Sequence, residues 1–99
     1  MTIEIKICGL KTREAVDAAL EAGADMIGFV HFPPSPRHIE LDAAAGLAAD
    51  LPAHVRAVVL TVDADDNEID QITAKVSPGM LQLHGGESPE RVRDIARRS

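Results

Sequence analysis

The chain has 99 residues, of which 45% are hydrophobic, and it contains two phenylalanines but neither tyrosine nor tryptophan; its formal charge at pH 7 is −6. This composition is typical of one soluble globular unit, and the acidic balance argues against a nucleic-acid surface. The single cysteine excludes an internal disulfide and suits a reducing compartment, and neither an export signal nor a long apolar run is present. We therefore expect a cytoplasmic protein that binds neither nucleic acid nor membrane.

One pattern occurs four times along the chain, a short apolar strand followed by an amphipathic helix. The strands are expected over residues 3–8, 26–32, 57–62 and 80–84. The helical residues expected to face the core are Val16, Ala19 and Leu20; Ala44, Leu47, Ala48 and Leu51; Ile69, Ile72 and Val76; and Val92, Ile95 and Ala96. Thr12, either Asp65 or Asp66, and Ser88 are expected to cap helices, and Gly23 is expected to end the first one.

Repeated strand and helix units require parallel strands joined by right-handed crossovers, which leaves an open doubly wound sheet or part of a (β/α) barrel. Strand alternation places Lys6 and Cys8 on one face, and Gln82 and His84 on the corresponding face of the fourth strand. An open sheet covered on both faces would be apolar on both sides, so these polar residues favour the mouth of a barrel.

Length sets the extent of that barrel, because a complete one takes about 250 residues. We therefore expect an α/β chain comprising the first four βα units of a (β/α)8 TIM barrel. Residues 1–99 would be the N-terminal half of a single barrel domain, with the C-terminal half absent. The two outer strands would then be unpaired edges, so we expect a partner, either the missing half-barrel or a second copy.

Cys8 lies where the first strand runs into a turn, at the end of a parallel strand where ligands are usually bound. Unpaired cysteines are more often small buried hydrophobes than reagents. A neighbouring ammonium, here that of Lys6, favours the reactive thiolate. These two interpretations of Cys8 remain equally supported by its residue type and position.

Four motifs in order resemble the phosphoribosylanthranilate isomerase family of tryptophan biosynthesis. They are Lys-Ile-Cys-Gly-Leu at 6–10, Gly-Ala-Asp-Met-Ile-Gly-Phe-Val at 23–30, Ser-Pro-Arg at 35–37 and Leu-Gln-Leu-His-Gly at 81–85. Each motif is weak alone, but four at barrel-unit spacing are specific. The resemblance covers all 99 residues and only the first half of that enzyme.

The resemblance implies an aldose-ketose isomerase that performs an Amadori rearrangement without a cofactor or metal. An aspartic acid opens the ribose ring, and a cysteine thiolate, matched by Cys8, removes the C2′ proton. Arg37 matches the arginine that binds the anthranilate carboxylate, although an exposed loop arginine is the commoner role in general. Gln82 and His84 match residues that line the sugar-facing side of the pocket, and a structural role for His84 is equally supported.

In this family the general acid lies on the sixth strand and the phosphate-binding loops follow the seventh and eighth, outside these 99 residues. We therefore expect the chain to be inactive alone toward its phosphosugar-anthranilate substrate. Two alternatives remain, a self-associating half-barrel without catalytic activity and a related phosphosugar isomerase or epimerase barrel.

Overall fold

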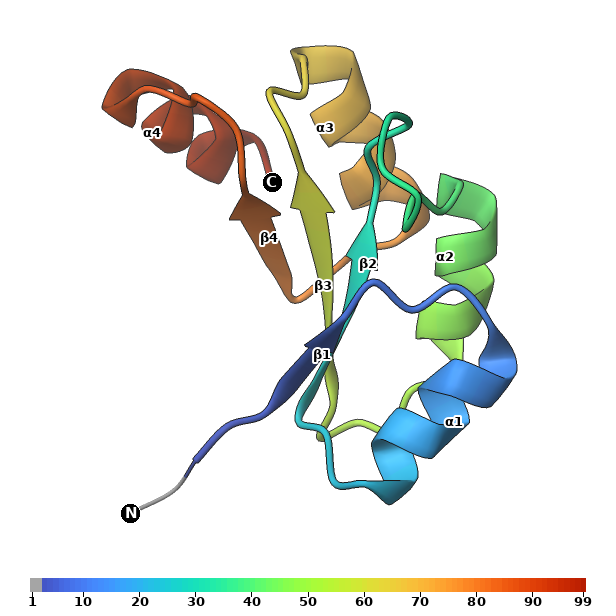
Figure 1. Cartoon of the computed structure of the whole chain (residues 1–99). Helices are drawn as coiled ribbons and strands as arrows, with labels where there is room; N and C mark the ends of the chain where they lie inside the picture. Colours follow the sequence, from blue (N-terminus) through green and yellow to red (C-terminus); the bar gives the residue numbers. More distant parts are fainter. Residues whose placement is uncertain (1–2) are drawn as a thin grey trace.

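The computed structural model describes residues 3–99, in which strands and helices alternate. The elements are β1 (Lys6–Cys8), α1 (Arg13–Glu21), β2 (Met26–Val30), α2 (Leu41–Ala49), β3 (Arg56–Thr61), α3 (Asp66–Lys75), β4 (Met80–Leu83) and α4 (Pro89–Arg98). The strands form one parallel sheet in the order β1-β2-β3-β4, with their arrows pointing the same way in Figure 1. The predicted α/β order of four strand and helix units is confirmed.

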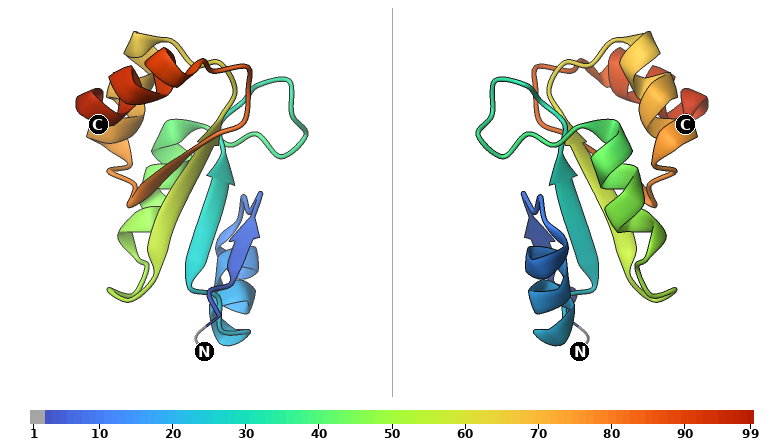
Figure 2. Two further views of the ribbon diagram at one scale, coloured as in Figure 1. Left: turned by 90° about the vertical axis from the view of Figure 1, so that its left-hand side faces the viewer. Right: turned by 90° about the vertical axis from the view of Figure 1, so that its right-hand side faces the viewer.

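The helices cover one face of the sheet. In the left view of Figure 2 the strands lie in front of α1 and α2, and in the right view these helices lie in front. Ile27 and Phe29 of β2 and Val59 of β3 are fully buried in the core cluster that the sheet forms with the helices. Val16 and Leu41 belong to the same cluster, so α1 and α2 both pack on this face.

The opposite face of the sheet is concave. A contact across this face indicates the curvature: Nζ of Lys6 on β1 donates a hydrogen bond to Oε1 of Gln82 on β4. These residues lie on the two outermost strands and are 76 positions apart in the chain. Side chains of strands that are not neighbours can meet only if the sheet curves, as it does in a barrel. The curvature favours half of a barrel over an open doubly wound sheet.

Three of the four helices begin with a side-chain cap, which satisfies a free backbone N–H group at the helix start. Thr12 Oγ1 accepts from the Ala15 N–H (3.1 Å), and Ser88 Oγ accepts from the Arg91 N–H (3.1 Å). Of the two candidates before α3, Asp65 is the cap, accepting from the Glu68 N–H at 2.8 Å. Gly23 follows α1 with φ +91°, a conformation that favours glycine. The expected caps are confirmed.

The first strand is shorter than expected. Ladder pairing begins at Lys6 opposite Met26, and Ile3 and Ile5 are 73% and 47% exposed. Of the three isoleucines in the predicted strand, Ile3, Ile5 and Ile7, only Ile7 packs against the core. The predicted strand therefore began too early: the Ile5 carbonyl still accepts from the Asp25 and Met26 N–H groups (2.8 and 3.1 Å), but β2 begins at Met26 and the paired register starts only at Lys6.

The predicted inner face of α4 also needs correction. Ile95 is buried, but Val92 is 44% exposed and Ala96 is exposed. A shallow groove of about 220 Å³ runs beside β4, lined by Leu81, Leu83, Val92, Ile95, Ala96 and Ser99. Within the part of the chain that the structure describes, β4 has a neighbour on one side only, so the outer flank of α4 is uncovered.

The exposed large hydrophobic residues gather at the two edges of the sheet. Ile3 and Ile5 lead into β1, Met80 begins β4, and Val92 lies on α4 beside it. The inner strands β2 and β3 carry none. In the described residues, no helix combines the length and apolar character needed to cross a membrane.

Candidate active site

The Cys8 thiol lies on the concave face, at the carboxyl end of β1. Cys8 pairs in register with Gly28 of β2, and a Cβ atom added at Gly28 would lie 2.7 Å from the Cys8 sulfur. Gly28 alternates with Ile27 and Phe29, which face the helices, so Gly28 and the sulfur above it face the other way. Cys8 is half-buried. Any side chain at position 28 would displace the sulfur, so glycine is required there.

Arg37 reaches the same rim from the loop between β2 and α2, which stands at the carboxyl end of β2 in Figure 1. Its Cδ atom would lie 2.6 Å from a Cβ atom added at Gly9, the residue after Cys8. Gly9 has φ +85°, so it supplies both the turn and the space for the arginine stem. The structure therefore brings Arg37 beside the turn that carries Cys8.

Local hydrogen bonds hold the shape of this proline-rich loop. The Arg37 N–H donates to Ser35 Oγ (3.1 Å), and the His38 N–H donates to the Ser35 carbonyl (3.1 Å). Lys11 Nζ donates to the Pro36 carbonyl (3.2 Å), which ties the loop to the β1–α1 turn. In residues 3–99 no carboxylate pairs with the Arg37 guanidinium, which is exposed and open to a ligand.

Gln82 and His84 come from the last strand and the turn that follows it. Gln82 is half-buried and faces Lys6 across the concave face. The His84 side chain is exposed. Its backbone N–H donates to the Thr61 carbonyl (2.9 Å), which continues the β3–β4 hydrogen bonding by one residue. The imidazole makes no hydrogen bond to the described residues. Of the four predicted site residues, Cys8 and Arg37 are brought together, Gln82 is linked to β1, and His84 stands apart at the rim.

A carboxylate clamp that sequence reasoning missed shapes the turn after His84. Glu87 accepts hydrogen bonds from the N–H groups of Asp63 (3.0 Å) and Gly85 (2.8 Å), and Asp63 Oδ1 accepts from the Gly86 N–H (2.8 Å). Asp63 has φ +49°, unusual for a residue with a side chain. A Cβ atom at Gly85 would collide with Asp63 at 2.6 Å. The pair of glycines therefore serves this clamp as well as the turn.

The clamp changes the ionisation of Glu87. Desolvation opposes the charged form, but backbone N–H groups of Glu87 itself, Asp63 and Gly85 and the charge of Arg91 outweigh it, so the pKa of Glu87 is lowered from 4.5. A carboxylate with a lowered pKa stabilises the fold above its unfolded value, and this stabilisation is lost as pH falls through the folded value.

We predict that Glu87→Gln destabilises the fold by about 1 kcal/mol at pH 7, because the amide retains one acceptor and adds a donor facing an N–H group. Urea unfolding of wild type and variant, repeated at several pH values, should show a difference that shrinks below about pH 4.5. Glu90→Gln is the matched control, since Glu90 is exposed and makes no hydrogen bond to the described residues. A difference that stays constant down to pH 3 would contradict the clamp.

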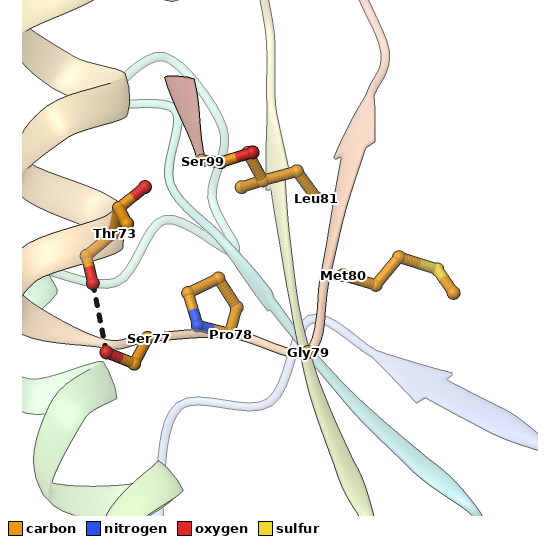
Figure 3. A pocket seen from close by; sticks show the side chains of 7 residues that line it. All are labelled: Thr73, Ser77, Pro78, Gly79, Met80, Leu81 and Ser99. Atoms are coloured by element: carbon orange, nitrogen blue, oxygen red, sulfur yellow. Dashed lines mark hydrogen bonds between the residues drawn. The ribbon is translucent and has the colours of Figure 1, made fainter. Parts of the chain in front are cut away.

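A more enclosed hollow, of about 320 Å³, lies at the other end of β4. Figure 3 shows it lined by Thr73, Ser77, Pro78, Gly79, Met80, Leu81 and Ser99. It opens at the amino end of the strand, remote from Cys8, and it carries no titratable side chain. Among residues 3–99, no group of three or more histidine, cysteine, aspartate or glutamate side chains is placed to hold a metal ion. The candidate site is therefore the carboxyl-terminal rim.

Comparisons with known proteins agree on one family. Residues 5–98 match the family model described as N-(5'phosphoribosyl)anthranilate (PRA) isomerase. The N-(5'-phosphoribosyl)anthranilate isomerase of Brucella canis is 60% identical over 98 residues, which are 99% of this chain and 44% of that protein. The chain therefore spans less than half the length of this relative.

Solved structures give the same result. The crystal structure of phosphoribosyl anthranilate isomerase from Thermotoga maritima has a TM-score of 0.93 and 35% identity, covering 98% of this chain and 47% of that one. A structure of such an isomerase in complex with reduced 1-(o-carboxyphenylamino)-1-deoxyribulose 5-phosphate has the same TM-score and identity, covering 98% of this chain and 50% of that one. A match along nearly the whole chain, on a curved sheet of four parallel strands, shows that the chain belongs to the N-(5'-phosphoribosyl)anthranilate isomerase family.

Proposed function

We propose that residues 1–99 form the N-terminal half of a barrel enzyme that isomerises N-(5'-phosphoribosyl)anthranilate to the corresponding 1-deoxyribulose 5-phosphate in tryptophan biosynthesis. The observation that carries this proposal is the Cys8 thiol on the concave face, with Arg37 held beside it over Gly9. A thiol inside the barrel mouth is placed to reach a sugar carbon, whereas one packed among the helices would not be.

In the proposed reaction an acid protonates the ribose ring oxygen, and the ring opens to an iminium ion. The Cys8 thiolate then takes the C2′ proton, and the electrons of the C–H bond move toward the iminium nitrogen to give an enolamine. Tautomerisation of the enolamine yields the aminoketose. Arg37 binds the anthranilate carboxylate through its planar fork, and Gln82 and His84 face the sugar. The general acid and the phosphate grip come from the other half of the barrel.

The ligand in the related crystal structure supports this substrate class. Reduced 1-(o-carboxyphenylamino)-1-deoxyribulose 5-phosphate carries a carboxylate, a sugar chain and a phosphate. The guanidinium of Arg37 is exposed and pairs with no carboxylate of residues 3–99, so it suits such a carboxylate. We place the activity in the cytoplasm, where a catalytic thiol stays reduced.

The partner that we propose is the C-terminal half-barrel, bound through the open edges of β1 and β4. Both edges lie in a parallel sheet and carry exposed apolar residues, Ile3 and Ile5 on one side and Met80 and Val92 on the other. The alternative partner, a second copy of this chain, would bind through the same edges. Light scattering of the purified chain separates the two, because a monomer at micromolar concentration excludes closure by a second copy.

The function is tested by reassembly. The chain is co-expressed with the C-terminal half of the Brucella canis relative, which is 60% identical across the shared half, and conversion of phosphoribosylanthranilate is measured. Neither half alone should turn over substrate, and the one-to-one complex should be active. A stable complex without activity, or binding of a different phosphosugar in preference to the reduced anthranilate analogue, would refute the proposed reaction.

A further inference from the structure

Lys6 is a cation on the concave face that the proposed reaction leaves without a role. It precedes Cys8 by two positions on β1, so both side chains face the same way, about 6.6 Å apart along the strand. Lys6 is half-buried, and in residues 3–99 no carboxylate forms an ion pair with it. In a chain of charge −6, a half-buried cation without a counter-charge is unexpected.

The neighbouring cation on this face is already neutralised. Arg56, at the amino end of β3, pairs with Glu4 at 3.2 Å. Arg37 lies at the rim, above Cys8. Among residues 3–99, Lys6 therefore carries a positive charge on the concave face that no carboxylate compensates, one layer below the thiol and in register with the first residues of β2 and β3.

The hydrogen bond between Lys6 and Gln82 sets the orientation of the Gln82 amide. Lys6 Nζ has three donors and no acceptor, so the Gln82 atom that faces it must be Oε1. Gln82 Nε2 then points away from the ammonium. Two N–H groups of Lys6 and two of Gln82 remain, and all four are donors.

We propose that Lys6 and Gln82 form a binding site for an anionic oxygen next to the Cys8 thiol. The four free donors and the unpaired charge favour a carboxylate or a similar oxyanion over a neutral acceptor. This inference extends the proposed function, and the identity of the natural ligand rests on that function. The test measures alkylation of the thiol and not isomerase activity. The anion site and the proposed function can therefore be refuted independently of each other.

Cys8 is the only cysteine, so its alkylation reports this position without interference. Iodoacetate and iodoacetamide react by the same step, in which the sulfur displaces iodide and an S–C bond replaces the C–I bond. They differ in carrying a carboxylate or a neutral amide beside the reacting carbon. The ratio of their rates therefore measures the attraction for an anion, and changes in thiol ionisation or access cancel.

Lys6→Met should lower the iodoacetate to iodoacetamide ratio about fivefold, the effect of one charge at about 4 Å in a largely aqueous site. Lys6→Arg should preserve the ratio. Lys75→Met is the matched control: it removes the same charge from α3, where Lys75 pairs with Asp42 at 3.3 Å, and it should leave the ratio unchanged. Raising the salt concentration should shrink the wild-type preference.

Gln82→Glu provides a second variant should Lys6→Met fail to fold. It places a carboxylate against Lys6 and keeps the length of both side chains, so it should lower the ratio to a similar extent. Circular dichroism establishes that each variant is folded before alkylation. A folded Lys6→Met or Gln82→Glu variant with the wild-type ratio would overturn the anion site.

Discussion

Replacing Cys8 by serine in the enzyme reassembled from two half-barrels is expected to lower kcat by about 10²- to 10⁴-fold, the usual contribution of a positioned general base. Serine has nearly the same shape, so the sulfur position over Gly28 is filled without collision. An alcohol ionises far less readily than a thiol, so the proton acceptor is lost while the packing remains.

Steady-state kinetics should show this loss in kcat with little change in KM, because proton removal belongs to the transition state and not to substrate binding. Gel filtration serves as the control that the Cys8→Ser chain still assembles with the second half. Arg37→Lys should behave differently, raising KM through loss of the bidentate carboxylate contact. Unchanged turnover in the serine variant would remove the thiol from the mechanism.

Truncating Phe29 to alanine is expected to cost about 3–5 kcal/mol in the free energy of unfolding. Phe29 is fully buried in β2, an inner strand of the sheet, and packs in the cluster that joins the sheet to the helices. Domains of this size are stable by about 5–15 kcal/mol, so such a loss removes much of the total.

The other phenylalanine gives the matched comparison. Phe32 lies beyond the end of β2 and is only half-buried, so Phe32→Ala should cost much less, about 1 kcal/mol. Urea unfolding followed by circular dichroism measures both variants under the same conditions. Equal losses from the two substitutions would show that the core is not centred on β2.

Elements governed by local chemistry were predictable from the sequence. A cap such as Thr12 or Ser88 depends on a few neighbouring residues, and strand alternation alone places Cys8 opposite the helices. Features that depend on distant partners were not. Ile3 lacks a strand beside it, and Val92 lacks a neighbour on the flank of α4, so apolar periodicity overstated their burial.

The candidate site divides in the same way. The place of Arg37 came from resemblance, because nothing in a proline-rich loop indicates that the side chain lies over Gly9. The contact between Lys6 and Gln82 joins residues 76 positions apart and depends on how strongly the sheet curves. Glu87 follows two glycines, which suggested a turn. The hydrogen bonds that its carboxylate accepts from the N–H groups of Asp63 and Gly85 became apparent only in the structure.

The bridge between Lys6 and Gln82 bears on the order in which a barrel of this family is built. A polypeptide leaves the ribosome with its N-terminal portion first, and that portion begins folding before the remainder is made. Because the bridge joins the outermost strands of this portion, the bend is held by residues synthesised early. In the barrel that we propose, strands added after β4 would therefore dock onto a sheet that is already curved.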